Sequence, residues 1–306
     1  MKKNNTQKFA GPLFCVLAAL LWGLSFVAQK TGAHIGTFTF NGIRTVIGGI
    51  FLLPFVPLFH NIKNKKLPDP KKTKFDFKGN LKGGIICGLV LFVASNLQQH
   101  AFTYDIFAAK VGFITALYMI IVPLAGLFMG SRVRFNVWIA VFLGVGGLYL
   151  LCMKPGDFKI GTGEIFSILC AFGFAAHILV IDRFCDETEP VALACFQFLI
   201  AGIISVILMF IFEKPALSDI LECAVPILYA GICSTGIAFT LQIFGQKYTE
   251  PTVASLLMCL ESVFSVIFGW IILHDVLSAR ALLGCAVMFA GVILSQIEIK
   301  SKGKEI

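Results

Sequence analysis

Long apolar stretches alternate with short polar segments along the whole chain. Each stretch is close to the roughly 20 residues that an α-helix needs to cross the hydrocarbon core of a bilayer. The pattern therefore predicts ten membrane-spanning helices. They fall at about 11–30, 36–59, 83–102, 106–129, 135–153, 163–181, 191–212, 222–244, 251–273 and 280–297.

Composition supports a membrane protein over a soluble one. Of the 306 residues, 58% are hydrophobic and only 14% are charged, whereas soluble chains carry about 25% charged residues. A soluble domain must cover its surface with polar groups, so this much apolar surface needs a lipid environment. The predicted fold class is an all-α integral membrane protein, and the loops leave no room for a soluble domain.

Charge along the chain predicts orientation. The net charge is +8, and most of the 25 lysines and arginines fall between the apolar stretches, on the side of the N-terminus. Segment 61–82 alone carries eight lysines. Because cytoplasmic loops collect Lys and Arg, both termini are expected in the cytoplasm and the protein in the cell membrane. The basic segment is an orientation anchor that anionic lipid would attract. No basic face with interleaved aromatic residues indicates nucleic-acid binding.

The chain also shows signs of an internal repeat. Spans 1 and 6, 3 and 8, and 5 and 10 share residues in the same order, which predicts two five-helix units at 1–154 and 155–306. The aligned pairs are Gly11 with Gly163, Phe14 with Phe166, Leu17 with Leu169, Ala19 with Ala171, Trp22 with Phe174, Leu97 with Leu241, Gln98 with Gln242, Tyr104 with Tyr248 and Gly147 with Gly291. Five is an odd number of crossings, so the second unit must be inverted. Inverted repeats are typical of carriers that alternate access to a midplane site.

Four segments together resemble the drug/metabolite transporter superfamily, and in particular its bacterial EamA-type ten-helix permeases. They are LLWGLSFVAQK at 20–30, NGIRTVIGGIFLLP at 41–54, 96–124 and 260–294. The Trp-Gly of span 1, Arg44, Pro123 and Glu261 fit the family pattern. Departures are Ser262 after Glu261, His274-Asp275 and Gly130-Ser131 in place of Gly-Glu pairs, and Lys110. The resemblance implies ATP-independent transport of small polar metabolites, most often amino acids.

Two charges lie deep within predicted spans. Arg44 stands about 12 Å from the outer end of span 2 at 1.5 Å per residue, and Glu261 lies near the middle of span 9. Ionisable residues inside a membrane are costly unless paired or hydrated, and they commonly mark transport pathways. Glu261 is the candidate site for a proton or a substrate ammonium, and Arg44 is its candidate coupling partner. The alternative is that both are fixed structural charges.

Further polar and aromatic residues near the middle of the spans are candidates to line the cavity. Asn96, Gln99 and His100 share one helical stripe, and Thr235 and Gln242 share a face. For each of them, ordinary packing or an interhelical hydrogen bond is the alternative. The full candidate substrate-binding set is Trp22, Ser25, Asn41, Arg44, Asn96, Gln99, His100, Tyr118, His177, Gln197, Thr235, Gln242 and Glu261.

Other protein classes lack support in the sequence. Hydrolase, zinc-protease and P-loop motifs are missing, and the ten cysteines are scattered without a Cys-x-x-Cys pair, so no enzyme, metal site or cofactor is expected. A channel or signalling protein would need a pore ring or a sensor domain. We predict a secondary-active exporter of a small polar metabolite, coupled to protons or exchange, working as a monomer or weak oligomer. The alternative is an uptake permease.

Overall fold

The computed structural model describes residues 5–65, 74–104, 106, 108–131, 133–153, 156, 160–273 and 278–297. Within them every regular element is a helix, and ten helical segments are long and apolar enough to span a membrane. This confirms the predicted all-α membrane fold. The basic segment at 61–82 and the His274-Asp275 pair lie partly or wholly outside the described residues.

Five spans consist of one helix or of one helix with a short extension. They are α5 (Phe77–Ala101), α8 (Phe135–Cys152), α9 (Thr162–Phe184), α10 (Pro190–Leu208), which the π-helix η3 (Met209–Glu213) extends, and α16 (Ala279–Gln296). In lipid, a helix is favoured because it satisfies its own backbone hydrogen bonds. Local residues fix the ends: the Asp76 carboxylate accepts a hydrogen bond from Gly79 N at the start of α5, and Pro190 occupies the first position of α10.

The other five spans are interrupted. They comprise α1 (Asn5–Trp22) with α2 (Ser25–Thr31), α3 (Thr37–Leu52) with α4 (Phe55–Lys65), α6 (Ala108–Thr115) with α7 (Tyr118–Phe128), α12 (Ala224–Tyr229) with the π-helix η4 (Ala230–Ala238) and α13 (Phe239–Tyr248), and α14 (Pro251–Met258) with α15 (Glu261–Leu273). The short helices η1 (Gly32–Ile35) and α11 (Leu217–Glu222) lie in connections. Backbone groups freed at such interruptions need partners inside the protein.

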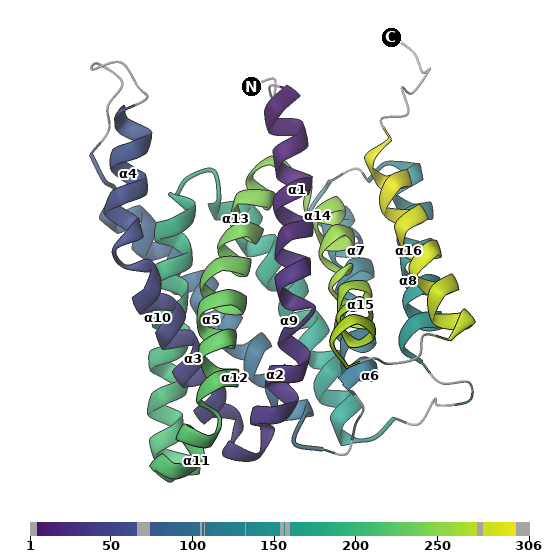
Figure 1. Cartoon of the computed structure of the whole chain (residues 1–306). Coiled ribbons are helices and arrows are strands. Elements are labelled where there is room, and N and C mark those ends of the chain that lie inside the picture. Colours follow the sequence, from purple (N-terminus) through teal and green to yellow (C-terminus); the bar gives the residue numbers. More distant parts are fainter. Residues whose placement is uncertain are drawn as a thin grey trace.

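Successive spans run in opposite directions, so α1 begins and α16 ends at the same end of the bundle (Figure 1). We call this the basic end, because Lys63, Lys65, Arg183 and Lys247 lie there at helix ends. The other end, where α9 begins, is called the opposite end. The assignment of the basic end to the cytoplasm stays a prediction from the loop charges.

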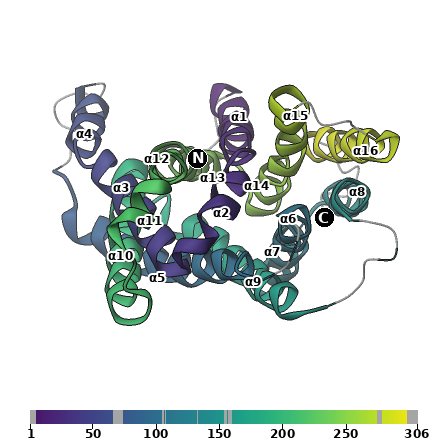
Figure 2. The same ribbon diagram turned by 60° about the horizontal axis from the view of Figure 1, so that its bottom comes forward.

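Each half of the chain packs mainly against the other half. The helix pairs α3 and α10, α5 and α9, α1 and α13, and α8 and α16 all join residues of 1–154 to residues of 155–306. Figure 2 shows α8 and α16 paired at one side of the bundle. The two halves therefore interlock and do not form separate bundles.

Glycine contacts in these pairs are reciprocal. A side chain on Gly147 would meet Gly284 O and Met288, while one on Gly291 would meet Ala140 O and Gly144. Gly147 and Gly291 are separated by as many residues as Ala140 and Gly284, and as Gly144 and Met288. Such reciprocity is what a pseudo-two-fold axis produces.

The α3–α10 pair behaves in the same way. A side chain on Gly42 would meet Val206, and one on Gly202 would meet Val46. Small residues let the helix backbones approach closely in both pairs. The inverted repeat stays a prediction, and these reciprocal contacts support it.

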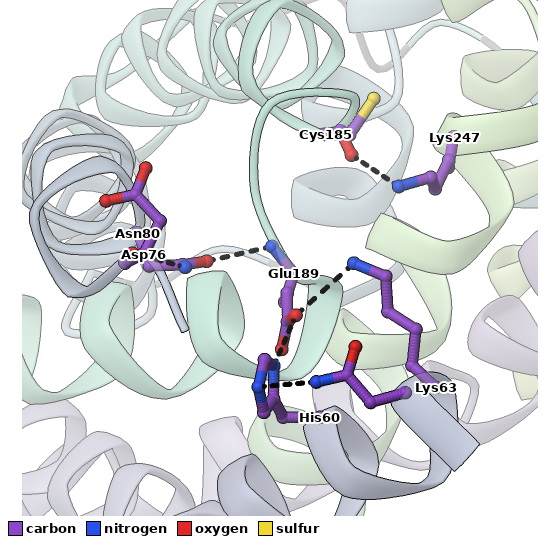
Figure 3. A network of polar contacts seen from close by, with 8 residues as sticks. His60, Lys63, Asp76, Asn80, Cys185, Glu189 and Lys247 are labelled. Carbon is purple, nitrogen blue, oxygen red and sulfur yellow. Dashed lines mark hydrogen bonds and ion pairs between the residues drawn. The ribbon is translucent and has the colours of Figure 1, made fainter. Parts of the chain in front are cut away.

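At the basic end, a polar network joins α4 and α5 of the first half to α10 of the second (Figure 3). His60 Nδ1 lies 2.8 Å and Lys63 Nζ 3.3 Å from Glu189 Oε1, and Glu189 N donates to Asn80 Oδ1 at 2.8 Å. Glu189 directly precedes α10. We call His60, Lys63, Asn80 and Glu189 the basic-end clamp.

A second polar cluster joins spans 2 and 7 at the opposite end. The Glu213 carboxylate, at the end of η3, accepts hydrogen bonds from Phe38 N at 2.9 Å and from Thr39 N and Thr39 Oγ1 at 2.7 Å each. Phe38 N and Thr39 N belong to the first turn of α3, whose backbone donors have no partner within the helix. Spans 2 and 7 are thus joined by polar contacts at both ends.

Candidate functional site

A cavity with about 50 Å³ of room for water-sized molecules lies in the middle of the bundle, where three broken spans meet. Its walls come from α1 and α2, from the break between α6 and α7, and from the break between α14 and α15, completed by α3, α5, α9 and span 8. The lining residues are Trp22, Ser25, Phe26, Gln29, Arg44, Gln98, Thr115, Tyr118, Phe174, Ile178, Ser234, Phe239, Gln242, Met258 and Glu261.

Many lining residues come in pairs that the predicted repeat relates. The alignment pairs Trp22 with Phe174 and Gln98 with Gln242, and all four line the cavity. The alignment of spans 1 and 6 also pairs Phe26 with Ile178. When spans 4 and 9 are aligned at their helix breaks, Thr115 pairs with Met258 and Tyr118 with Glu261. The cavity therefore lies where the pseudo-two-fold axis would cross the bundle.

Glu261 is the first residue of α15, directly after the break at Cys259 and Leu260. Its side chain is 7% exposed, and no hydrogen bond or ion pair joins it to another described residue. The start of a helix carries a partial positive charge, which favours a carboxylate there. Glu261 thus presents a buried acceptor group to the cavity.

Arg44 lies two turns into α3 and is 4% exposed. Its Nε donates to Asn41 Oδ1 at 2.7 Å, and the guanidinium carbon lies 5.7 Å from the centre of the Phe40 ring. Within the described part of the chain, the two Nη nitrogens have no hydrogen-bond partner, and Arg44 forms no ion pair with Glu261. Asn41 thus holds the guanidinium through Nε, and the two Nη groups remain as hydrogen-bond donors.

A short hydrogen-bonded chain shapes one wall of the cavity. The Ser25 and Ser234 hydroxyls lie 2.9 Å apart, Trp22 Nε1 donates to Ser234 O at 3.2 Å, and Gln29 Nε2 donates to Ser25 Oγ at 3.4 Å. Ser234 belongs to the π-helix η4, a form frequent at functional sites. The Phe239 ring packs edge-on against Trp22 with a centroid distance of 4.8 Å.

Six of the residues nominated from sequence line this cavity: Trp22, Ser25, Arg44, Tyr118, Gln242 and Glu261. The others lie beside it or elsewhere in the bundle. Asn41 Nδ2 donates to Ser95 O and Asn96 Oδ1, and Asn96 Nδ2 donates to Ser205 Oγ. Asn41 thus positions Arg44 and joins span 2 to span 3, while Asn96 joins span 3 to span 7.

The remaining nominated residues also have partners in the packing. Gln99 Nε2 donates to Gln29 O at 3.0 Å, His100 Nδ1 lies 3.2 Å from Thr37 Oγ1, and His177 Nε2 lies 3.0 Å from Gln197 Oε1. The methyl group of Thr235 faces Gly48 of α3. These residues make interhelical contacts, the alternative role stated from sequence.

Several lining residues are not among the candidates predicted from sequence, including Gln29, Gln98, Thr115 and Ser234. Gln98 had a usable signal, because the repeat alignment pairs it with the nominated Gln242. Ser234 had none, since its position depends on the π-helical turn of η4. Among the described residues, no cluster of three His, Cys, Asp or Glu side chains is placed to hold a metal ion.

This construction, a ten-span bundle whose buried charged cavity lies at helix breaks, is that of a membrane transporter. The model of the EamA-like transporter family matches residues 9–153 and 161–296. The chain therefore belongs to the EamA-like transporter family. The two matched ranges fall within the two predicted five-helix units.

Relatives from distant organisms are similar over most of their length. An uncharacterized transporter of Archaeoglobus fulgidus is 26% identical over 302 residues, covering 97% of this chain and 89% of the relative. The uncharacterized transporter YoaV of Bacillus subtilis is 23% identical, covering 92% and 94%. A chloroplastic WAT1-related protein of Arabidopsis thaliana is 23% identical, covering 89% and 66%.

A solved crystal structure has the same fold. It superposes with a TM-score of 0.74 at 20% sequence identity and covers 93% of this chain and 96% of the other. Fold, family and relatives agree that this protein is a multi-pass membrane transporter.

Proposed function

We propose that this transporter carries a small zwitterionic metabolite, an amino acid or a related compound, by secondary-active alternating access. The observation that carries the proposal is that Arg44 and Glu261 line one cavity without pairing with each other. A buried charge without a partner is costly. A ligand with one carboxylate and one ammonium group supplies the missing partner to each side chain, so its binding is favoured over that of a singly charged compound.

The aromatic walls extend this specificity. Trp22, Phe26, Tyr118, Phe174 and Phe239 surround the charged groups. Aromatic faces attract cations and bury apolar groups. An ammonium group with an apolar substituent therefore fits the cavity better than a strongly hydrated ion of the same charge.

Energy coupling is proposed to run through Glu261, by protons or by substrate exchange. Carboxylates buried in membrane helices commonly serve as proton relays. Export across the cell membrane, with the basic end in the cytoplasm, is the proposed direction. Transport measured in vesicles of both orientations tests it, and accumulation on the side of the basic end would establish uptake as the function.

Counterflow in proteoliposomes tests the substrate class. Zwitterionic amino acids, the corresponding amines without a carboxylate and the corresponding acids without an ammonium group form a matched panel. We expect saturable exchange for the zwitterions and weaker exchange for both partial analogues. Equal exchange of all three classes, or conductance without exchange as in a channel, would contradict the proposal.

A further inference from the structure

An apolar cluster, which we call the plug, borders the cavity on the side of the opposite end. Phe26, Ala101, Phe102, Ile106 and Val111 form a separate hydrophobic cluster, and each is at most 7% exposed. Phe26 also lines the cavity, so the plug begins where the cavity ends. These residues come from α2, α5, the connection after α5, and α6. A substrate that enters or leaves on this side must displace them.

The start of α9 packs directly on this plug. A side chain on Gly163 would meet Ile106 at 3.2 Å, Tyr104 at 3.3 Å and Ala101 O at 3.4 Å. The plug is therefore held between the first half of the chain and the first turn of the second half. Separation of α9 from α5 and α6 would release it.

A buried ion pair joins the same two elements. Lys110 Nζ lies 2.7 Å from Glu164 Oε1, and the two side chains are 8% and 13% exposed. Lys110 is next to Val111 of the plug, and Glu164 is next to Gly163. The second carboxylate oxygen, Oε2, accepts a hydrogen bond from Gly161 N at 2.9 Å, which fixes the side chain.

The equivalent contact at the basic end has no such pair. The predicted repeat relates Gly163 to Gly11, and a side chain on Gly11 would meet Tyr248 and Thr249, as one on Gly163 would meet Tyr104. The position after Gly11 is Pro12, and the third residue of α14, which corresponds to Lys110, is Val253. The contacts at Gly163 and Gly11 thus share a geometry, but only the contact at Gly163 has opposite charges beside it.

From this asymmetry we propose that Lys110 and Glu164 form the lock of the gate at the opposite end. Resting on the proposed alternating-access function, the lock favours the closed state of this gate. When the gate opens, the two charges separate and become hydrated, so loss of the pair shifts the population toward the state open to this side. Lys110 and Glu164 are positioning residues, since they act through the plug and do not touch the substrate.

The labelling of two native cysteines can show which end of the bundle opens. Cys170 lies on α9 between Glu164 and the middle of the helix, with its Sγ 3.8 Å from Thr115 Oγ1 of α6. Cys15 lies on α1, where it faces Gly245 of α13 toward the basic end. Both are fully buried. Opening of the gate between α6 and α9 should expose Cys170 and leave Cys15 covered.

The experiment measures maleimide labelling of the full-length protein in right-side-out and inside-out vesicles without substrate. Peptide mass spectrometry then gives the labelling of each cysteine separately. The variants are Lys110→Met and Glu164→Gln, the second of which retains an acceptor for Gly161 N. We expect each to raise Cys170 labelling at least about fivefold, from the side of the opposite end only, with no rise at Cys15. Cys170 labelling in the double variant should equal that in either single variant, because one substitution already breaks the ion pair.

Unchanged Cys170 labelling in both variants would overturn the lock. A joint rise at Cys170 and Cys15 would also overturn it, because that result indicates general loosening of the bundle. The outcome is independent of the substrate class. If labelling responds as expected while zwitterions show no counterflow, the lock stands and the proposed substrate is wrong.

Discussion

Tyr118 and Glu261 occupy corresponding places in two broken spans. Each is the first residue of the second helix, after an eight-residue helix and a two-residue interruption, and each lines the cavity. The predicted repeat thus places a neutral phenol at one site and a carboxylate at the other. This difference makes the cavity electrically asymmetric.

Replacement of Glu261 by Gln should impair transport without unfolding the protein. The amide keeps the size of the side chain but removes the charge that is proposed to bind an ammonium group. A charged hydrogen bond contributes about 1.5–3 kcal/mol, so we expect counterflow rates to fall roughly 10- to 100-fold. Glu250→Gln is the matched control, because Glu250 is exposed at the start of the same span. Equal rates for wild type and Glu261→Gln would exclude the carboxylate from the mechanism.

We expect Arg44 to favour binding of substrates that carry a carboxylate over those that do not. In Arg44→Lys the positive charge remains but the planar fork is lost, and in Arg44→Gln both are lost. We expect KM for a zwitterion to rise in the order wild type, Lys and Gln, by about tenfold at the last step. KM for the amine analogue, measured in the same vesicles, should change little.

The control for this series is Arg183→Gln. Arg183 is an exposed arginine that pairs with Glu187 at the basic end. A rise in KM for the amine equal to that for the zwitterion would show that Arg44 supports the fold and does not bind the carboxylate.

The α8–α16 seam should be sensitive to a single methyl group. A Cβ on Gly147 would lie 2.7 Å from Gly284 O and 2.8 Å from Met288 N, which are backbone atoms of the facing helix. Gly147→Ala should therefore destabilise the protein by about 1–3 kcal/mol, seen as a lower Tm in detergent.

Gly146→Ala is the neighbouring control, because a Cβ there meets nothing within 4 Å. Its expected effect is a gain of about 0.5–1 kcal/mol from helix propensity. Similar destabilisation by both substitutions would contradict the close approach of the two helices.

The basic-end clamp should depend on Glu189. This carboxylate is 15% exposed and lies against His60 and Lys63, so Glu189→Gln removes a charged hydrogen bond from a half-buried site. We expect a loss of about 1–3 kcal/mol in stability, measured by thermal unfolding in detergent.

Glu187 provides the comparison two residues earlier. It pairs with Arg183 on the surface, and both side chains are more than half exposed. Surface pairs contribute little, so Glu187→Gln should leave Tm unchanged. Equal Tm values for Glu189→Gln and Glu187→Gln would show that the basic-end clamp does not stabilise the protein.

The sequence by itself determined the class of fold and the order of its spans. Because lipid admits only long apolar helices, the ten stretches could be placed from composition and length alone. The deep charges Arg44 and Glu261 could also be found in this way, since charged residues are rare inside spans. The aligned pairs Trp22 with Phe174 and Gln98 with Gln242 could be found in the sequence, and all four residues line the cavity.

Only the tertiary structure decided which polar residues face the cavity. Gln98 lines it while Gln99 donates to a backbone carbonyl, and adjacent residues on a helix point about 100° apart, so no composition rule separates them. The structure also shows contacts between distant spans, among them the pairing of Lys110 with Glu164 and the contact of Ser234 with Ser25. Local sequence cannot specify them, because each depends on where another helix approaches.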